Sequence, residues 1–437
     1  MKIKIFIKTF GCKVNQYDSE LMRENLIMDP NFELVDNYLK ADLFIINSCF
    51  VTENAEKDVI KEIKRFLKFG KVIITGCFNK NFNMDNLFFL DINNKIKIRE
   101  FIYQIYNINI KEKFYKYKIE NFLDRTRAFV KIEEGCNKFC SYCIVPYLRG
   151  RAKSRDIDEI LDEVNQLIEN GYKEIVLTGT ELGYFGLEKG ENITTLLKKL
   201  LSINKNFRIR LSSIDPEFLS NEVIYLIRDN PKICPHIHLP LQSGSDKILQ
   251  KMNRRYTVSK YLEKIDLFKK NVKNGTVTTD IIVGFPFEEE EDLEKTIDII
   301  KKVKFLKCHI FPYSKRDGTA AAKYNYKIDE NILIERLKKI KDVANTMRRE
   351  VIDSFNNKEL ILLTEGNKNG KLFGFTENYI RVYINDKYKK NNFYKISLQT
   401  DKNNVEYGIV LNEHYYSNIE GGEIKKCQQY IEEKVKI

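Results

Sequence analysis

The stretch AFVKIEEGCNKFCSYC, residues 128–143, joins an apolar run to a loop that carries three cysteines. The run AFVKIEE has the composition of a half-buried β-strand. Cys136, Cys140 and Cys143 follow it with the spacing C-x3-C-x2-C. Because a tetrahedral metal site takes four ligands, three cysteines leave one position to be filled from elsewhere in the chain or left open.

The strand at 128–134 is the first of six strand candidates in this part of the chain. The others are EIVLTG at 174–179, RIRLSS at 208–213, HIHLPLQ at 236–242, TVTTDIIVGF at 276–285 and LKCHIFPYS at 306–314. Helical stretches such as 157–170, 193–202 and 290–303 separate them. Six β/α units in a row predict a barrel or partial barrel whose chemistry lies at the carboxyl ends of the strands. The cysteine loop follows the first strand, so we expect it on that reactive face.

A second α/β series occupies the first 80 residues. KIKIFIK at 2–8, ADLFIIN at 41–47 and KVIIT at 71–75 are predicted strands, with helices at 17–28 and 52–69 between them. This alternation predicts a parallel sheet covered by helices.

A cysteine follows each of these three strands: Cys12, Cys49 and Cys77. Ligands bind at the carboxyl edge of an open α/β sheet. One cysteine at that edge could be a coincidence. Because all three strands are followed by a cysteine, we expect the three thiols to lie close together.

The chain after residue 353 has a different texture. Residues 359–386 and 393–413 are short apolar and polar alternations joined by polar turns, which predict a small β barrel. We therefore divide the chain into residues 1–110, 122–350 and 353–420.

The composition is that of a protein with a large core and an excess of positive charge. The 437 residues are 43% hydrophobic and 31% charged, with a net charge of +12. Residues 301–350 hold 14 basic and 6 acidic side chains, so much of the excess lies around the basic helix predicted at 334–350. That helix is either a solvated face or a contact for a polyanion. Without a signal-like or membrane-spanning stretch, we expect a reducing, cytoplasmic location.

The nine cysteines favour metal binding over disulfides in such a compartment. Thiolates suit zinc or iron–sulfur clusters. The nearest histidines, His236, His238 and His309, lie far along the chain. The six cysteines form two groups of three and do not make the set of four ligands that a structural zinc site takes. Two iron–sulfur clusters, each with one iron open to a ligand from outside the protein, fit the count better.

The loop GCNKFCSYC, placed after the first strand of a β/α series, resembles the radical S-adenosylmethionine (SAM) family. The resemblance implies that Cys136, Cys140 and Cys143 hold a [4Fe–4S] cluster whose open iron binds SAM. Cleavage of SAM then yields a 5′-deoxyadenosyl radical, and the protein positions and shields it. Tyr142 matches the aromatic residue usual in this loop.

Longer motifs narrow the resemblance to the methylthiotransferases. They are FGCKVNQYDSE at 10–20, CSYCIVPYLRGRAKSR at 140–155, RLSSIDP at 210–216, HLPLQSGSDKILQKMNRRYT at 238–257, DIIVGFPFE at 280–288, FPYSKRDGTAA at 311–321 and LFGFTENYIRV at 372–382. The resemblance implies a flavodoxin-like N-terminal domain with a second [4Fe–4S] cluster on Cys12, Cys49 and Cys77. It also implies that the C-terminal barrel is an RNA-binding TRAM domain.

Further site residues come from this resemblance and from their places at strand ends. Gly179 and Glu181 fit a loop that meets the SAM amino group, and Ser213, Gln242 and Asp280 are placed to bind SAM or substrate. A polar residue after a strand is as often a helix cap or a loop support. Arg149, Arg151 and Arg155 are candidate phosphate contacts, with an ion-paired face as the alternative. For His236 and His238 ordinary strand packing is the better interpretation, and Cys234, Cys308 and Cys427 are given no role.

The resemblance implies a tRNA methylthiotransferase, an enzyme whose partners are a tRNA anticodon stem-loop, an electron donor such as flavodoxin or ferredoxin, and a sulfur donor. A carbon radical can attack an inert C–H bond of adenine, and a second SAM supplies the methyl group. A single-stranded loop makes the base reachable. One alternative is a relative that modifies a ribosomal protein. Another is an RNA-binding protein with structural zinc.

Two tRNA branches share this architecture, and both act at tRNA position 37. One modifies N6-isopentenyladenosine and the other N6-threonylcarbamoyladenosine. Residues 13–16, KVNQ, stand where the first branch usually shows a QMNE-like string, so we expect the second branch. A carboxylate substituent needs cationic partners. Arg254, Arg255, Lys315 and Arg316 are the candidates.

Overall fold

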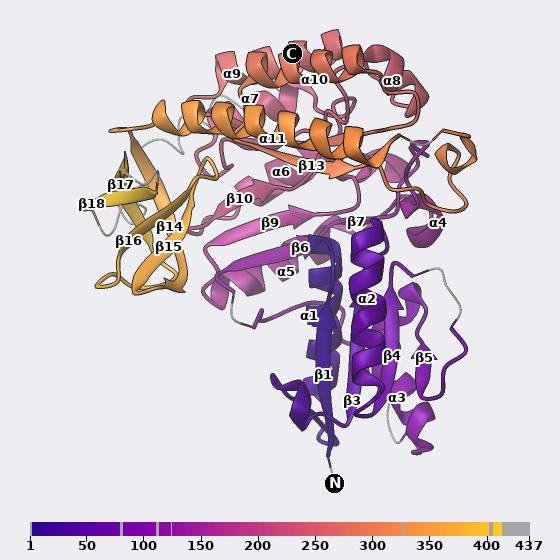
Figure 1. The fold of residues 1–437 in the computed structure, drawn as a ribbon. Coiled ribbons are helices and arrows are strands. Elements are labelled where there is room, and N and C mark those ends of the chain that lie inside the picture. Colours follow the sequence, from indigo (N-terminus) through magenta and orange to yellow (C-terminus); the bar gives the residue numbers. More distant parts are fainter. Residues whose placement is uncertain are drawn as a thin grey trace.

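The computed structural model describes residues 2–78, 82–110, 113–123, 125–326, 328–401 and 405–412. Three units follow one another along the chain, and Figure 1 shows them as an indigo and purple N-terminal sheet, a magenta core and an orange and yellow barrel. No helix in these ranges is long and apolar enough to cross a membrane.

The N-terminal unit is a five-stranded parallel sheet with helices on both faces, as predicted. Its order is β2-β1-β3-β4-β5, with the strands β1 Ile3–Thr9, β2 Phe32–Leu34, β3 Leu43–Ser48, β4 Lys71–Gly76 and β5 Leu87–Phe89. The helices are α1 Lys13–Ile27, α2 Glu53–Phe66 and α3 Ile98–Tyr106, with 3-10 turns η1 Tyr38–Lys40 and η2 Ile92–Lys97. Strands β2 and β5 are additional to the prediction, because three residues are too few to show a period.

Strand alternation builds two apolar layers in this unit. Ile45 packs in the layer under α1 and α3, whereas Phe44 and Ile46 pack in the layer under α2. Because β3 lies in the middle of the sheet, its residues are buried on both faces.

The central unit is the predicted partial (β/α)6 barrel. Its strands are β6 Arg127–Lys131, β9 Glu174–Thr178, β10 Arg208–Leu211, β11 His236–His238, β12 Thr276–Val283 and β13 Lys307–Pro312. They form two parallel three-stranded sheets, β10-β9-β6 and β11-β12-β13. Parallel bridges between Ser213 and His238 and between Ile209 and Ile233 join the two sheets into one curved surface.

Helices cover the outer face of this surface (Figure 1). They are α5 Ile157–Glu169, α6 Ile193–Leu201, α7 Asn221–Asp229, α8 Asp246–Lys251, α9 Val258–Asn271 and α10 Glu290–Val303, with 3-10 turns η3 Leu182–Tyr184, η4 Leu187–Lys189 and η5 Ala321–Lys323. Apolar residues such as Ile175, Leu211 and Ile281 pack against these helices. Their neighbours on the inner face, such as Glu174, Arg210 and Asp280, are charged. The barrel therefore has an apolar outside and a polar inside.

A long helix leads to the C-terminal barrel. α11 Glu330–Asp353 runs beside α10 and β13, and Figure 1 shows it crossing the core to the barrel. The strands β14 Glu359–Lys368, β15 Lys371–Thr376, β16 Arg381–Asn385, β17 Phe393–Thr400 and β18 Glu406–Asn412 form a closed barrel, which confirms the predicted fold. Closure leaves no edge strand open to wrong pairing.

Two buried arginines attach this barrel to the core. Arg208 and Arg210 of β10 both bind the buried carboxylate of Glu174, at 2.6 and 2.7 Å. Their remaining N–H groups donate to the carbonyls of Ile361 and Thr376 in the small barrel, each at 3.1 Å. Buried charges of this kind are stable only while every partner is present.

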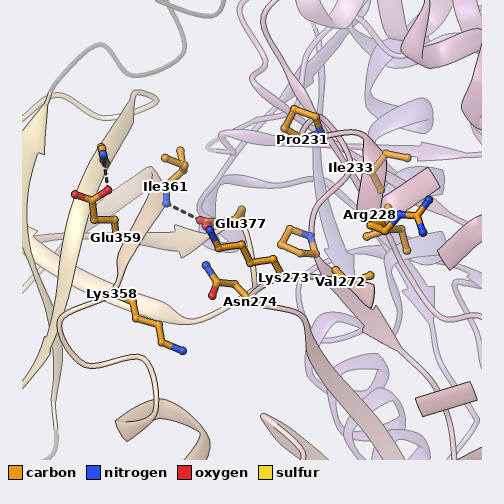
Figure 2. A pocket seen from close by; sticks show the side chains of 13 residues that line it. Arg228, Pro231, Ile233, Val272, Lys273, Asn274, Lys358, Glu359, Ile361 and Glu377 are labelled. Atoms are coloured by element: carbon orange, nitrogen blue, oxygen red, sulfur yellow. Dashed lines mark hydrogen bonds and ion pairs between the residues drawn. The ribbon is translucent and has the colours of Figure 1, made fainter. Parts of the chain in front are cut away.

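A cavity of about 660 Å³ lies along the same joint (Figure 2). Pro231, Ile233 and Asn274 of the core line one side, and Lys358 and Glu377 line the other. These core residues precede β11 and β12, so the cavity is at the amino ends of the strands. It is not the site at which the cysteine loops lie.

Candidate metal centres

The N-terminal cysteines meet at the carboxyl edge of the sheet, as the sequence predicts. Cys12 precedes α1, Cys49 follows β3 and Cys77 follows β4. The amide of Cys77 donates to the carbonyl of Ser48, the residue before Cys49, at 3.1 Å, and a thiolate at Cys77 or Cys12 would raise the pKa of Cys49. Gly11 allows Cys49 to lie close to the residue before Cys12, because a Cβ atom on residue 11 would lie only 2.6 Å from the Cβ of Cys49.

The second triad lies in a loop that is fixed at both ends. The short strands β7 Glu133–Glu134 and β8 Lys153–Ser154 pair across its base. Cys136 donates its amide to the carbonyl of Gly150 at 3.1 Å, and the amide of Ser141 donates to the carbonyl of Met252 at 3.0 Å. Tyr142 packs its ring against Phe285 in a small apolar cluster. These contacts fix the loop independently of the cysteine side chains.

Burial makes the thiols weak acids. It raises the pKa of Cys49 to about 11 and the pKa values of Cys136 and Cys143 to about 12. Such thiols keep their protons at neutral pH until a metal replaces them. None of the eight described cysteines is in a disulfide.

An arginine donates to a thiol in the N-terminal triad. Arg149, the last residue of α4 Val145–Arg149, donates from Nε to Sγ of Cys77 at 3.1 Å. Its other nitrogens bind Glu134 at 2.5 Å, Asn15, and Asp18 at 3.6 Å. α4 follows the second triad in sequence, and Gly150, the residue after Arg149, accepts from the amide of Cys136, so this segment touches both cysteine sites. Arg149 was predicted as a phosphate contact, and these buried bonds show that interpretation to be wrong.

A second arginine donates to the other triad. Arg254 donates to Sγ of Cys140 at 3.2 Å and forms an ion pair with the buried Asp215. Lys138 binds the same carboxylate at 2.5 Å. Hydrogen bonds and positive charge near cluster sulfurs favour the more negative, reduced state of an iron–sulfur cluster. The sequence pattern predicted Arg254 to be one of the substrate cations, but the side chain contacts the metal site.

Buried ion pairs connect the N-terminal unit to the core. Asp18 of α1 binds Lys95 and Lys131, each at 2.6 Å. Although burial alone would raise it, these cations hold the pKa of Asp18 below its usual range. Arg155, another predicted phosphate contact, binds Glu163 at 2.6 Å and Tyr17 at 3.0 Å. Of the three predicted phosphate contacts, Arg151 alone is exposed.

The predicted SAM-binding residues lie at the carboxyl ends of neighbouring strands. Glu181 accepts from the amides of Gly183 and Asp215 at 3.1 and 2.9 Å, which is a loop-supporting role. Burial and the charge of Asp215 raise its pKa to about 7. Gly179 packs against Glu133, where a Cβ would lie 2.8 Å from a carboxylate oxygen. Gln242 has φ +65°, and its backbone N–H donates to the backbone carbonyl of Asp280 at 2.8 Å.

A polar cluster on the inner face of the barrel was not predicted. The carboxylate of Asp280 lies 3.2 Å from Nε2 of His238, and the rings of His238 and His309 are 5.7 Å apart. His236 and His238 share the hydroxyl of Thr278, at 3.0 and 2.9 Å. Strand packing describes the buried His236, but His238 belongs to this cluster. The alternation H-I-H was the available signal, since it puts both rings on one face.

The other residues predicted to bind a substrate carboxylate have different environments in the structure. Arg316 binds Glu56 of α2 at 2.6 Å and so links the core to the N-terminal unit. Arg255 and Lys315 are exposed. Cys234 precedes β11 and Cys308 lies within β13, and Cys427 is outside the described residues.

The donor sets fit iron–sulfur clusters. Each triad offers three thiols, an arginine donor and a buried anion that fixes the arginine. Among the described residues, no group of three or more His, Cys, Asp or Glu side chains is arranged to hold a single metal ion. In a four-iron cluster each thiolate binds a different iron, so its ligands stand farther apart than those of one ion.

Known families match both α/β units. Residues 130–300 match the Radical SAM superfamily, and residues 4–91 match the family described as Uncharacterized protein family UPF0004. The solved radical SAM methyltransferase TsrM from Kitasatospora setae covers 71% of this chain and 73% of its own, with a TM-score of 0.50 and 12% identity. That likeness concerns the fold alone.

Curated relatives match nearly the full length. The threonylcarbamoyladenosine tRNA methylthiotransferase MtaB of Thermotoga maritima is 36% identical over 86% of this chain and 90% of its own. MtaB of Bacillus subtilis is 34% identical over 86% and 88%. The tRNA-2-methylthio-N(6)-dimethylallyladenosine synthase of Acetivibrio thermocellus is 35% identical over 84% and 82%. With SAM and iron–sulfur chemistry as its cofactors, the chain belongs to the radical SAM methylthiotransferase family, close to MtaB.

Proposed function

We propose that this protein is a tRNA methylthiotransferase that adds a 2-methylthio group to N6-threonylcarbamoyladenosine at tRNA position 37. The contact from Arg149 to Cys77 carries the proposal, because the next residue, Gly150, accepts from the amide of Cys136 at 3.1 Å, so one short segment touches both cysteine triads. An enzyme that must bring a radical and a sulfur to the same carbon needs its two centres close together. The substrate follows the names of the MtaB relatives.

The six cysteines divide into two ligand sets in this proposal. Cys136, Cys140 and Cys143 hold the [4Fe–4S] cluster that binds SAM, and Cys12, Cys49 and Cys77 hold the second cluster. When bound, the first cluster and SAM supply the carbon radical, and the second supplies sulfur. Tyr142 shields the SAM site, while Gly179, Glu181, Ser213, Gln242 and Asp280 line the space for SAM and substrate.

The proposal also gives each of the three units a role and names the partners of the enzyme. We assign residues 1–110 to sulfur delivery, 122–350 to radical chemistry and 353–420 to RNA binding as a TRAM-like domain; residues 402–404 and 413–420 of the last range lie outside the described part. A hollow of about 460 Å³ between β13 and α11 brings together Lys307, Lys341 and Arg348, which suits phosphate. The proposal places the enzyme in the cytoplasm, with a flavodoxin or ferredoxin as electron donor and a separate sulfur donor.

The division of labour between the triads gives the first prediction. Anaerobically reconstituted protein should hold about eight irons, on six thiolates. Replacing Cys140 with Ala should abolish SAM cleavage. Replacing Cys49 with Ala should leave about four irons and intact SAM cleavage but stop methylthiolation, because the radical then meets no sulfur. Iron, sulfide and 5′-deoxyadenosine assays measure these outcomes, and Cys234→Ala is the matched control.

Equal loss of SAM cleavage in both cysteine variants, with folded protein, would contradict this division. One or two zinc ions without sulfide would favour a structural-zinc RNA-binding protein instead. Nucleoside mass spectrometry of tRNA, from a host that lacks its own methylthiotransferases and expresses this protein, identifies which modified adenosine is the substrate. A methylthio group on isopentenyladenosine alone would move the assignment to the other tRNA branch, and binding to a ribosomal protein in place of tRNA would favour the protein-modifying relative.

A further inference from the structure

Arg149 directs one N–H group at a sulfur atom that the proposed function assigns to the second cluster. Its side chain is only 2% exposed, and its Nε donates to Sγ of Cys77 at 3.1 Å. The other two nitrogens of the same guanidinium group bind the carboxylate of Glu134, at 2.5 Å, and the side-chain oxygen of Asn15. Because all three nitrogens have partners, the N–H group that faces Cys77 cannot turn away without breaking the other two contacts.

The charges linked to Arg149 do not cancel. Asp18 binds Lys95 and Lys131, each at 2.6 Å, and lies 3.6 Å from Arg149. Glu134 binds Lys131 at 2.8 Å as well as Arg149. Three cations therefore share two carboxylates in one connected set of ion pairs, which we call the boundary network. This network carries one excess positive charge beside the N-terminal cysteines.

A hydrogen bond to a ligand sulfur and a nearby positive charge both favour the reduced form of an iron–sulfur cluster, because reduction adds one negative charge to it. Water and salt screen buried charges less than exposed ones, so the effect is largest for a buried cation. We propose that Arg149 is a positioning residue that holds Cys77 and raises the reduction potential of the second cluster. The inference rests on the proposed function, which assigns that cluster to Cys12, Cys49 and Cys77.

The electron count of the proposed reaction shows why this potential matters. The 5′-deoxyadenosyl radical removes a hydrogen atom from the adenine carbon, and that hydrogen leaves in 5′-deoxyadenosine. The new C–S bond takes one electron from the carbon radical and one from an electron pair of the sulfur anion. The other electron of that pair must pass to an acceptor, and in the proposed function the second cluster holds the sulfur. A higher reduction potential makes that cluster a better acceptor.

Redox titration followed by electron paramagnetic resonance tests the inference on protein with both clusters loaded. A variant in which Cys136, Cys140 and Cys143 are all replaced by Ala identifies the signal of the second cluster. Arg149→Met should shift the equilibrium of that cluster about 10- to 100-fold toward the oxidised form. For a one-electron couple, this change lowers the reduction potential by about 60–120 mV. Arg149→Lys keeps the charge and should lower the potential less.

Glu134→Gln should have the opposite effect. It removes a negative charge from the boundary network, and the amide oxygen can still accept from Arg149, so the potential of the second cluster should rise. Arg151→Gln is the matched control, because Arg151 lies two residues after Arg149 but is exposed and packs on the ring of Phe139. It should leave the potential of the second cluster unchanged. Iron and sulfide analysis shows whether each variant holds both clusters.

An Arg149→Met protein that holds both clusters at the wild-type potential overturns the inference, and so does an unchanged or lowered potential in Glu134→Gln. If Arg149→Met fails to assemble the second cluster, the titration of Glu134→Gln decides by itself. The measurement needs no tRNA, so a wrong modified base or a wrong RNA partner leaves its result unaffected. If wild-type protein assembles no iron–sulfur cluster on the N-terminal cysteines, the proposed function fails, and the role of Arg149 fails with it.

Discussion

Gly11 shows how a single residue controls the geometry of the N-terminal cysteines. Its φ of +89° lies in the region that favours glycine, and the space for a Cβ is filled by Cβ and Sγ of Cys49, at 2.6 and 2.7 Å. Contacts this short cannot be relieved by a flexible side-chain end, since Cβ of Cys49 is fixed by β3. A larger residue must push the thiol of Cys49 away from its two partners.

Gly11→Ala should therefore prevent the N-terminal cluster from assembling while the first cluster remains. The expected iron content is about four per chain, with normal SAM cleavage and no methylthiolation. Gly171→Ala is the control, because Gly171 has φ +92° but nothing within 4 Å of its Cβ position. It should lose only about 1–2 kcal/mol in free energy of unfolding from backbone strain. A Gly11→Ala protein with about eight irons would contradict the argument.

At the scale of elements, strand β10 holds the small barrel to the core. Arg208 and Arg210 share the carboxylate of Glu174, and their other N–H groups reach carbonyls in β14 and β15. Their partners lie more than 150 residues away in sequence. Removal of the barrel would leave two arginines without these carbonyls, so truncation near residue 353 tests stability as much as RNA binding.

Arg210→Met should lower the free energy of unfolding by about 3–5 kcal/mol, because the charge of Glu174 stays buried with one partner fewer. The small barrel should also become separable from the core by limited proteolysis. Arg228→Met is the comparison: Arg228 is 38% exposed and pairs with Asp229 at the surface, so its loss should cost less than about 1 kcal/mol. Equal destabilisation by both substitutions, in chemical denaturation, would show that burial does not decide the cost.

Across the whole molecule, the positive charge is partly paired and partly available. On α11, Arg336 and Lys339 bind Glu290 of α10 at 3.2 and 2.7 Å, so this part of the basic segment is an ion-paired helix face. Lys338 and Lys341 on the same helix are exposed, and Lys341 lines the hollow beside β13. Exposed lysines can release counterions when a phosphate binds.

Replacing Lys338 and Lys341 together with Gln should weaken tRNA binding and reduce its salt dependence. Each lost phosphate contact lowers the slope of log affinity against log salt by about 0.7–0.9, so the pair should lower it by up to about 1.8. Lys198→Gln is the control, because Lys198 of α6 forms an exposed ion pair with Glu222 of α7 and should leave the slope unchanged. An unchanged slope in the Lys338/Lys341 variant would exclude α11 from the tRNA interface.

The sequence by itself determined the main strands and the residues at their carboxyl ends. Hydrophobic periodicity predicted all six core strands and the small C-terminal barrel, and a cysteine after each N-terminal strand predicted three thiols at one sheet edge, because these patterns are local properties of the chain. It also placed Cys136, Cys140 and Cys143 after the first core strand. The edge strands β2 and β5 escaped prediction, since three residues carry no period.

Only the tertiary structure decided which cation meets which anion. Arg149 and Arg254 were predicted to contact phosphate and substrate, yet they donate to Cys77 and Cys140. Sequence pattern indicates whether a side chain is near a strand end, but an arginine's partner depends on how units distant in sequence dock. That docking therefore determines which charges surround the two cysteine triads, because a buried charge is stable only next to a partner of opposite charge.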